Sequence, residues 1–177
     1  MSFERTDSET IWEGRIATVR VDRFRYDDGG EAEREIVAHP GAVAVVAHDG
    51  DHLFLVTQPR EAVDEQALLE LPAGKLDTQG EEPLDTAKRE LAEEIGKAAA
   101  SWEYLTTFYT SPGFADEECH LYLATELEDA DGASADENER IEIVVRPLSE
   151  LDDVIAGCRD SKTLIGLLWF RAFGGPR

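Results

Sequence analysis

The chain has 177 residues, with 39 aspartates and glutamates against 17 lysines and arginines, and a formal net charge of −22. A field of this sign repels nucleic acid and anionic membranes, so neither is an expected partner. The length indicates one domain with at most a small appendage, and 42% hydrophobic residues are enough to form a core.

The basic residues include only four lysines. Acidic, lysine-poor surfaces suit a chain in very high salt, where charge repulsion is screened within about 3 Å, so we expect a halophilic cytoplasm. The two cysteines, Cys119 and Cys158, lack the spacing of a zinc site or a disulfide scaffold. Neither a leader nor an apolar run of about 18 residues is present, which predicts a soluble cytoplasmic protein.

The first forty residues predict mainly β-structure. Residues 1–9 are polar and are expected to be loose. Residues 11–26 carry β-branched and aromatic side chains, residues 27–30 form a turn, and residues 33–37 return as the second arm of a hairpin. His39-Pro40-Gly41 ends this pattern.

The rest of the chain alternates strands and helices. Residues 42–47 form a continuous apolar run, which is typical of a strand buried on both faces. Residues 83–95 predict a helix with a proline in its first turn, a glycine after its end and one apolar stripe. Further strands are expected at residues 53–58, 68–72, 104–109, 120–126 and 141–146, and closing helices at 148–156 and 161–173.

The helix at 83–95 carries an unusual set of acids. Glu90, Glu93 and Glu94 lie at i, i+3 and i+4, away from the apolar stripe, although like charges at this spacing repel by about 0.2–0.5 kcal/mol per pair. The set is either a solvated face, which the acidic composition favours, or a group of oxygen ligands for a divalent cation. Magnesium prefers such hard oxygen ligands and keeps waters or phosphates in its shell.

Residues 74–96 resemble the signature of the Nudix hydrolases. That signature has a glycine, five residues, a glutamate, seven residues, then Arg-Glu-aliphatic-any-Glu-Glu-any-Gly-aliphatic. This chain has Gly74, then Glu81, then seven residues to RELAEEIG at 89–96. Six residues instead of five follow Gly74, and Lys97 replaces the last aliphatic residue.

Other segments resemble the ADP-ribose pyrophosphatase branch of that family. They are Trp12-Glu13-Gly14, Arg34 to Val37, Gln58-Pro59-Arg60, Leu71 to Lys75 and Ser111 to Phe114. The resemblance implies an α/β fold, a Nudix-type α/β/α sandwich around a mixed β-sheet, with a small N-terminal β-rich segment. It implies that residues 1–40 form a dimerisation segment exchanged between the subunits of a homodimer, and that residues 41–177 form the catalytic domain.

The resemblance also implies roles for individual residues. Glu90 and Glu94 would be the main ligands of Mg²⁺, with Mn²⁺ as a possible substitute, and Glu93, Glu81 and the carbonyl of Ala73 would assist. Arg89 would orient a neighbouring carboxylate. A general base would come from an acidic loop beyond the helix. Glu137 and Glu139 are the main candidates for it, and Glu142 is a less favoured one. By composition alone, those acids read as a solvated loop.

Substrate-binding residues are expected on both sides of the helix. Arg60 would grip a phosphate with two hydrogen bonds, unless it forms a surface ion pair. Arg34 and Glu35 would contact the distal ribose or the partner subunit, unless they are cross-strand pairs. Pro112 and Gly113 form a tight turn that is expected to line the pocket. Trp12 would stack on adenine or belong to an interface core.

The expected activity is Mg²⁺-dependent hydrolysis of ADP-ribose to AMP and ribose 5-phosphate. One alternative is hydrolysis of another nucleoside diphosphate sugar or a dinucleotide. A second alternative, from a different class, is a non-catalytic ligand-binding regulator on a Nudix-like domain. The intact glutamate set argues against this, because a binding protein has no need of the metal face. An isomerase is disfavoured, because no cysteine lies in the strand before the motif.

Overall fold

The computed structural model describes residues 1–130 and 140–174, and these divide into two compact units. Unit 1 comprises Met1–Gly41 and Tyr109–Glu118, and unit 2 comprises Ala42–Phe108 and Cys119 onward. Unit 1 is therefore built from two stretches of chain that are far apart in sequence. The proposed catalytic helix lies wholly within unit 2.

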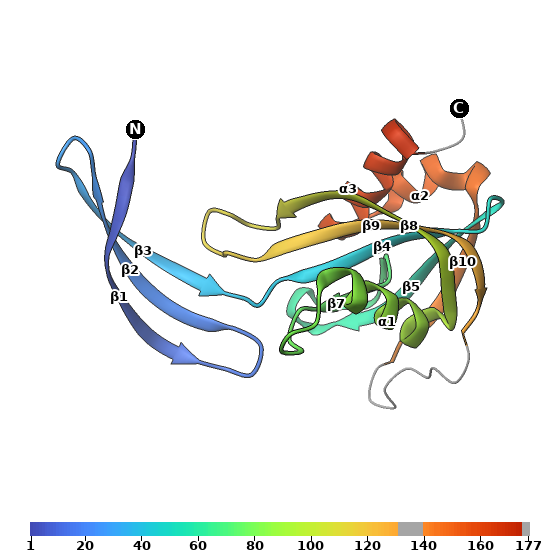
Figure 1. Cartoon of the computed structure of the whole chain (residues 1–177), viewed down its shortest axis with the longest axis horizontal. Coiled ribbons are helices and arrows are strands. Elements are labelled where there is room, and N and C mark those ends of the chain that lie inside the picture. Colours follow the sequence, from blue (N-terminus) through green and yellow to red (C-terminus); the bar gives the residue numbers. More distant parts are fainter. Residues whose placement is uncertain (131–139, 175–177) are drawn as a thin grey trace. The chain divides into compact units, whose positions relative to one another are not determined.

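Unit 1 is a three-stranded antiparallel sheet in the order β1-β2-β3, seen at the blue end of the chain in Figure 1. Its strands are Phe3–Glu13, Thr18–Tyr26 and Glu31–Ala38. The hairpin of β2 and β3 was predicted. The expectation that residues 1–9 are loose was wrong, because β1 pairs with β2 from Phe3 to Glu13.

Strand β1 is held by pairs of side chains rather than by an apolar face. All eleven of its residues are exposed. Arg23 on β2 donates to Asp7 on β1 at 2.6 Å, and Phe3 meets the edge of Phe24 with ring centroids 5.4 Å apart. Cross-strand pairs of this kind each contribute about 0.2–1 kcal/mol, which explains how a polar sequence forms a strand.

The second stretch of unit 1, residues 109–118, is joined to β2 and β3. The backbone N–H of Val37 donates to the carbonyl of Phe114 at 2.8 Å. Nη2 of Arg20 lies 3.0 Å from a carboxylate oxygen of Asp116. Asp116 also accepts from the N–H of His39 at 2.9 Å. The predicted tight turn at Pro112-Gly113 is thus anchored to the N-terminal sheet.

Unit 2 contains a mixed seven-stranded sheet with the path β10-β5-β4-β9-β8, to which β6 adds beside β5 and β7 beside β4. Strand β4 is parallel to β9 and antiparallel to β5 and β7. The strands are Ala42–His48 (β4), His52–Arg60 (β5), Glu65–Glu70 (β6), Ala73–Lys75 (β7), Lys97–Tyr109 (β8), Glu118–Asp129 (β9) and Glu142–Pro147 (β10).

Helices cover both faces of this sheet, which confirms the predicted α/β/α sandwich (Figure 1). Strand β4 is buried from Ala42 to Ala47, and its side chains alternate between the two cores. Val45 packs with Leu91 on one face, and Val46 packs with Leu167 on the other. The helices are α1 (Pro83–Ile95), α2 (Leu151–Gly157) and α3 (Ser161–Trp169), with short turns at Glu61–Val63, Leu148–Glu150 and Phe170–Gly174.

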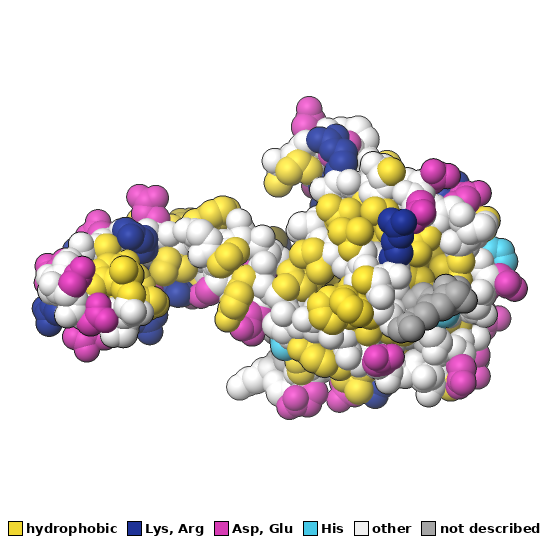
Figure 2. Space-filling view, turned by 90° about the horizontal axis from the view of Figure 1, so that it is seen from above, with side chains coloured by type: hydrophobic (Ala, Val, Ile, Leu, Met, Phe, Trp, Pro, Cys, Tyr) yellow, Lys and Arg dark blue, Asp and Glu magenta, His cyan; other side chains and the backbone are white. Residues whose placement is uncertain are grey.

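The surface carries the acidic excess of the sequence. Acidic side chains are scattered in small groups over the face shown in Figure 2, with basic and apolar side chains between them. Within residues 1–130 and 140–174, no helix is long and apolar enough to cross a membrane.

Candidate active site

Helix α1 carries the glutamate set, and its ends are fixed by local sequence. Pro83 occupies the first turn, where its missing N–H has no partner to lose. Gly96 ends the helix with φ of 65°, a left-handed conformation that glycine adopts without steric cost. Ala87, Leu91 and Ile95 lie on the side of the helix that faces the sheet, and all three are buried. The helix predicted from sequence at residues 83–95 is confirmed.

Glu94 is the most deeply placed acid of the helix, with 6% of its surface exposed. Its Oε2 accepts a hydrogen bond from the backbone N–H of Ala73 at 3.0 Å. A buried carboxylate is costly unless it is hydrogen-bonded, so this contact with β7 fixes the position of Glu94. Glu94 therefore faces the short strand that the sequence motif places before the helix.

Glu90 lies against Gly74, the residue after Ala73. A Cβ atom at Gly74 would stand 2.1 Å from Oε1 of Glu90, so a larger residue there would push the Glu90 carboxylate out of its place. The glycine leaves the space that this carboxylate occupies. Glu90 and Glu94 thus both contact the Ala73-Gly74 segment.

Arg89 binds three of the acids. Its Nε and Nη2 lie 3.2 and 3.1 Å from the two carboxylate oxygens of Glu81. Its Nη1 lies 2.8 Å from Glu90 and 2.9 Å from Glu93. The bonds to Glu81, together with the charges of Glu90 and Glu93, raise the pKa of Arg89 despite its partial burial. The same bonds hold the pKa of Glu81 below its usual value.

The additional residue between Gly74 and Glu81 does not separate Glu81 from the other acids. Gly80 adopts φ of 81°, which turns the chain just before Glu81. The hydroxyl of Thr86 donates to Glu81 at 2.9 Å, in addition to the two bonds from Arg89. The extra residue is thus accommodated in the turn before the helix.

The oxygen donors of this cluster are chemically suited to a hard divalent cation. They are the carboxylates of α1, among which that of Glu90 lies against the backbone of Gly74. Within the part of the chain that the structure describes, no three acidic, histidine or cysteine side chains are already gathered into a metal-sized cage. Arg89 draws Glu81, Glu90 and Glu93 together, so a cation would compete with a guanidinium for these oxygens.

Arg60, at the end of β5, is paired with a buried acid that the sequence did not single out. Its Nε and Nη2 each lie 2.6 Å from a different carboxylate oxygen of Glu70, the last residue of β6. Glu70 is 1% exposed. These bonds raise the pKa of Arg60 against the effect of burial, and the nearby charges of Asp160 and Glu94 act in the same direction. The bidentate hydrogen bonding that was expected between Arg60 and a phosphate is thus made to Glu70 instead.

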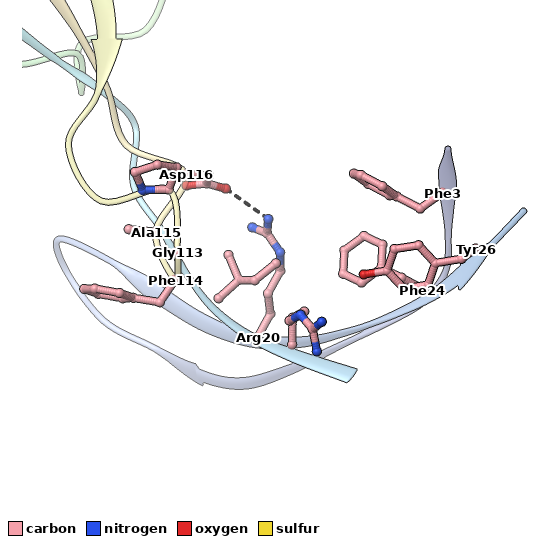
Figure 3. A pocket seen from close by; sticks show the side chains of 11 residues that line it. Phe3, Arg20, Phe24, Tyr26, Gly113, Phe114, Ala115 and Asp116 are labelled. Carbon is pink, nitrogen blue, oxygen red and sulfur yellow. Dashed lines mark hydrogen bonds and ion pairs between the residues drawn. The ribbon is translucent and has the colours of Figure 1, made fainter. Parts of the chain in front are cut away.

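Three of the predicted substrate-binding residues, Arg34, Pro112 and Gly113, line one pocket of about 280 Å³ within unit 1. Figure 3 shows Phe3, Phe24 and Tyr26 at one end of this pocket, residues 113–116 at the other and Arg20 between them. Arg20 donates to Asp116 at the end of the pocket formed by residues 113–116. The pocket therefore combines aromatic rings with guanidinium groups.

The remaining candidates are dispersed. Glu35 is exposed on β3, opposite Val21. Glu142 is exposed at the start of β10, opposite Thr57 of β5. Trp12 is 57% exposed, and its indole covers Gly14, where a Cβ atom would meet it at 2.0 Å. Glu137 and Glu139 lie outside the described residues.

The α/β/α sandwich and the acidic helix, which faces a glycine-containing strand, define the class of the protein. This class is the Nudix fold. Residues 38–163 match the family model described as NUDIX domain. The chain is 40% identical over 167 residues to a methanol dehydrogenase activator of Bacillus methanolicus, covering 93% of this chain and 90% of that one. It is 44% identical over 138 residues to an ADP-ribose pyrophosphatase of Mycobacterium tuberculosis, covering 77% of this chain and 66% of that one.

A solved structure gives the same fold. The crystal structure of an ADP compounds hydrolase superposes with a TM-score of 0.84, covering 98% of this chain and 94% of that chain at 22% identity. The chain belongs to the Nudix family and is a Nudix hydrolase. Members of this family generally use divalent metal ions.

Proposed function

We propose that this hydrolase splits the pyrophosphate bond of ADP-ribose, giving AMP and ribose 5-phosphate, with Mg²⁺ as its cofactor. The observation that carries the proposal is the arrangement of Glu90 and Glu94 on the Ala73-Gly74 backbone, with Arg89 holding Glu81 and Glu93 beside them. The name of the relative that is 44% identical supports ADP-ribose among diphosphate substrates.

Residues of α1 and of the segments that precede it would hold the cofactor. Glu90 and Glu94 would be the main ligands, with Glu93, Glu81 and the carbonyl of Ala73 in support. When bound, Mg²⁺ supplies neutralisation of the phosphate charge and a lowered pKa for water. Arg89 would keep the acids in position as it does in the structure, releasing those that the cation recruits.

A general base is required to take a proton from the attacking water. Glu137 and Glu139 remain our candidates from the sequence. Glu142 is the less favoured alternative, and it lies within the residues that the structure describes. It precedes Ile143 on β10, and its neighbour across the ladder, Thr57, directly precedes the Gln58-Pro59-Arg60 segment.

Substrate contacts are proposed for Arg60 and for four residues that the sequence motif singled out. Arg60 would contact a phosphate through Nη1, since Nε and Nη2 are bonded to Glu70. Arg34, Glu35, Pro112 and Gly113 would bind the nucleoside or distal ribose, supported by the pocket that three of them line.

A substrate panel tests the proposal. ADP-ribose, GDP-mannose and a dinucleoside diphosphate would be incubated with the full chain and Mg²⁺ at low and multimolar salt, with products identified by chromatography. We expect fastest cleavage of ADP-ribose, with AMP and ribose 5-phosphate as products. Faster cleavage of another diphosphate would replace the substrate but keep the reaction class.

A second candidate function is supported by the relative named as a methanol dehydrogenase activator, at 40% identity over nearly the whole chain. The chain would then act as a regulator of another protein. Cleavage of none of these diphosphates with Mg²⁺ or Mn²⁺ would favour this regulator over the hydrolase.

We also propose that residues 1–40 form a dimerisation segment, that the protein is a homodimer, and that it works in a halophilic cytoplasm. Strand β1 exposes every residue, including the large apolar side chains of Phe3, Ile11 and Trp12. Light scattering of the full chain and of a Phe3→Ser, Trp12→Ser variant at 0.1 and 2 M salt measures the mass. A monomeric wild-type chain in both salts would contradict the dimer.

A further inference from the structure

The segment from Leu71 to Ala73 connects β6 to β7 and brings the Ala73 backbone to Glu94. Its backbone is bonded at each step. The N–H of Val45 donates to the carbonyl of Pro72 at 2.9 Å, and the N–H of Ala73 donates to Glu94 at 3.0 Å. Leu71 itself is 1% exposed. The N–H of Leu71 begins this segment.

That N–H is bound by a residue 92 positions later in the chain. The hydroxyl of Thr163, on α3, accepts from Leu71 N–H at 2.8 Å. The same hydroxyl donates to a carboxylate oxygen of Asp160 at 2.7 Å, so its single proton is committed and its lone pair faces Leu71. Thr163 is fully buried, and Asp160 caps α3 by accepting from the Thr163 N–H at 2.8 Å.

The side chain of Leu71 is held by the same helix. Gly166 lies one turn beyond Thr163, and a Cβ atom there would stand 2.5 Å from a methyl carbon of Leu71. It would also stand 3.1 Å from Leu121 and 3.3 Å from Val46, two side chains of the buried core. Because Gly166 has no side chain, α3 approaches Leu71 directly, and the core leaves little space into which Leu71 can shift.

We propose that Thr163 and Gly166 are positioning residues of the active site, through which α3 sets where the Ala73 backbone meets Glu94. Neither lies in the signature motif, and both act through Leu71 rather than on substrate. The inference rests on the proposed function, because it takes Glu94 and Ala73 as part of the metal site. The competing account is that Thr163 only satisfies a buried N–H and stabilises the core.

A positioning role predicts weaker metal binding in the variants, whereas a purely structural role predicts lower stability alone. Metal binding can be measured without substrate. Mn²⁺ would be titrated into the full-length protein and free Mn²⁺ followed by electron paramagnetic resonance, with urea unfolding on the same samples. Thr163→Val keeps the shape and removes the hydroxyl. We expect it to weaken Mn²⁺ binding about tenfold, the lower end of the range for side chains that bond a metal ligand directly, because Thr163 acts through Leu71. Thr163→Ser keeps the hydroxyl and should bind within about threefold of the wild type.

Gly166→Ala provides an independent variant. Alanine favours a helix more than glycine does, so the substitution does not weaken α3 itself. Its methyl group would displace Leu71, and we expect weaker Mn²⁺ binding here too. Val154→Ala is the control, because Val154 is buried on α2 in the same core. It should lower the urea midpoint while leaving Mn²⁺ affinity unchanged.

The outcomes distinguish the positioning role from the proposed function. If Glu94→Gln binds Mn²⁺ like the wild type, the metal role of Glu94 is wrong and the proposed function fails with it. If Glu94→Gln loses binding while Gly166→Ala and Thr163→Val retain it, only the positioning role is overturned. Should Thr163→Val not fold, Gly166→Ala decides alone, with retained affinity overturning the inference and weakened affinity supporting it.

Discussion

Arg60 and Glu70 form a two-bonded pair in which each carboxylate oxygen lies 2.6 Å from a different guanidinium nitrogen. The acid is 1% exposed, and the arginine side chain is 41% exposed. A buried acid at the end of one strand is thus neutralised by an arginine at the end of its neighbour. Glu70 is the last residue of β6, the strand that leads directly into the Leu71–Gly74 segment.

Removal of Arg60 should destabilise the fold. Arg60→Ala would leave the Glu70 charge buried without its partner, and we expect a loss of about 3 kcal/mol in the free energy of unfolding. Urea denaturation measures this. Replacing both residues, with Arg60→Met and Glu70→Leu, should recover most of the loss, because neither charge then remains.

Arg159→Ala is the matched control for Arg60. Arg159 pairs with Glu65 on the surface, and such exposed pairs contribute about 0–1 kcal/mol. Equal losses for Arg60→Ala and Arg159→Ala would contradict a special role for the buried pair.

Glu94→Gln should abolish turnover and preserve the fold. The amide oxygen of glutamine can still accept from the Ala73 N–H, but the charge that a cation requires is gone. Residues that bond a metal ligand typically cost up to about 100-fold when they are replaced. Because Glu94 is proposed as a ligand itself, we expect kcat to fall by more than that. Steady-state kinetics with ADP-ribose and Mg²⁺, together with a melting curve, measure both effects.

Glu103→Gln serves as the control, because Glu103 is an exposed acid on β8. It should retain wild-type kinetics. Full activity of the Glu94 variant in Mg²⁺ would contradict the assignment of the active site.

Arg89→Ala should make stability depend on divalent metal. Glu81, Glu90 and Glu93 share this guanidinium, and without it their charges repel one another. In EDTA we expect a lower melting temperature than the wild type. Added Mg²⁺ binds only the folded state and should raise the variant's melting temperature more than the wild type's.

Lys88→Ala tests whether any lost cation on α1 has this effect. Lys88 pairs with Asp85 on the exposed side of the helix. It should respond to Mg²⁺ as the wild type does, and a response as large as that of Arg89→Ala would refute the shared-cation account.

Asp160 should contribute to acid sensitivity. Burial opposes its charge, but Lys162 and the bonds from Thr163 outweigh burial and hold the pKa of Asp160 below its usual value. A group whose folded pKa is depressed stabilises the fold above its unfolded pKa, which is about 3.9 for aspartate. That contribution is lost as pH falls from about 4 through the folded pKa.

Asp160→Asn removes this titration and keeps a side chain that can cap α3. We expect the variant to be less stable than the wild type at pH 7, with the difference shrinking below about pH 4. Urea unfolding at pH 7, 5 and 3.5 measures it, with Asp153→Asn, at an exposed position of α2, as a charge-matched control. A constant difference across this range would show that Asp160 does not titrate as described.

Local sequence was sufficient to predict α1 and its acids. The Pro83 start, the Gly96 end and the apolar stripe all lie within one helix, so their geometry follows from helical spacing alone. The same is true of the hairpin turn before β3. Predicting β1 failed because its sequence has no apolar alternation, and its pairing depends on ion pairs with β2, from Arg5 to Asp22 and from Arg23 to Asp7.

Contacts between distant segments could not be predicted from spacing. Glu70 looked like an ordinary acid in an acidic chain. In the ladder of β5 and β6 it lies opposite Val56, and only the long side chain of Arg60 reaches back to it. Thr163 carried no signal at all, since its partner Leu71 lies 92 positions earlier. The signature motif therefore located the acids, but not the residues that hold the strand facing them.

The two-stretch construction of unit 1 has a consequence for the order in which the protein can fold during synthesis. Residues 1–41 leave the ribosome first, yet Arg20 and Val37 find their partners in residues 114–116. The N-terminal sheet must therefore wait, partly formed, until about seventy further residues have been made. Until then β3 lacks its bonds to residues 114–116 and is an open edge, so the nascent chain is most exposed to misplaced pairing in this interval.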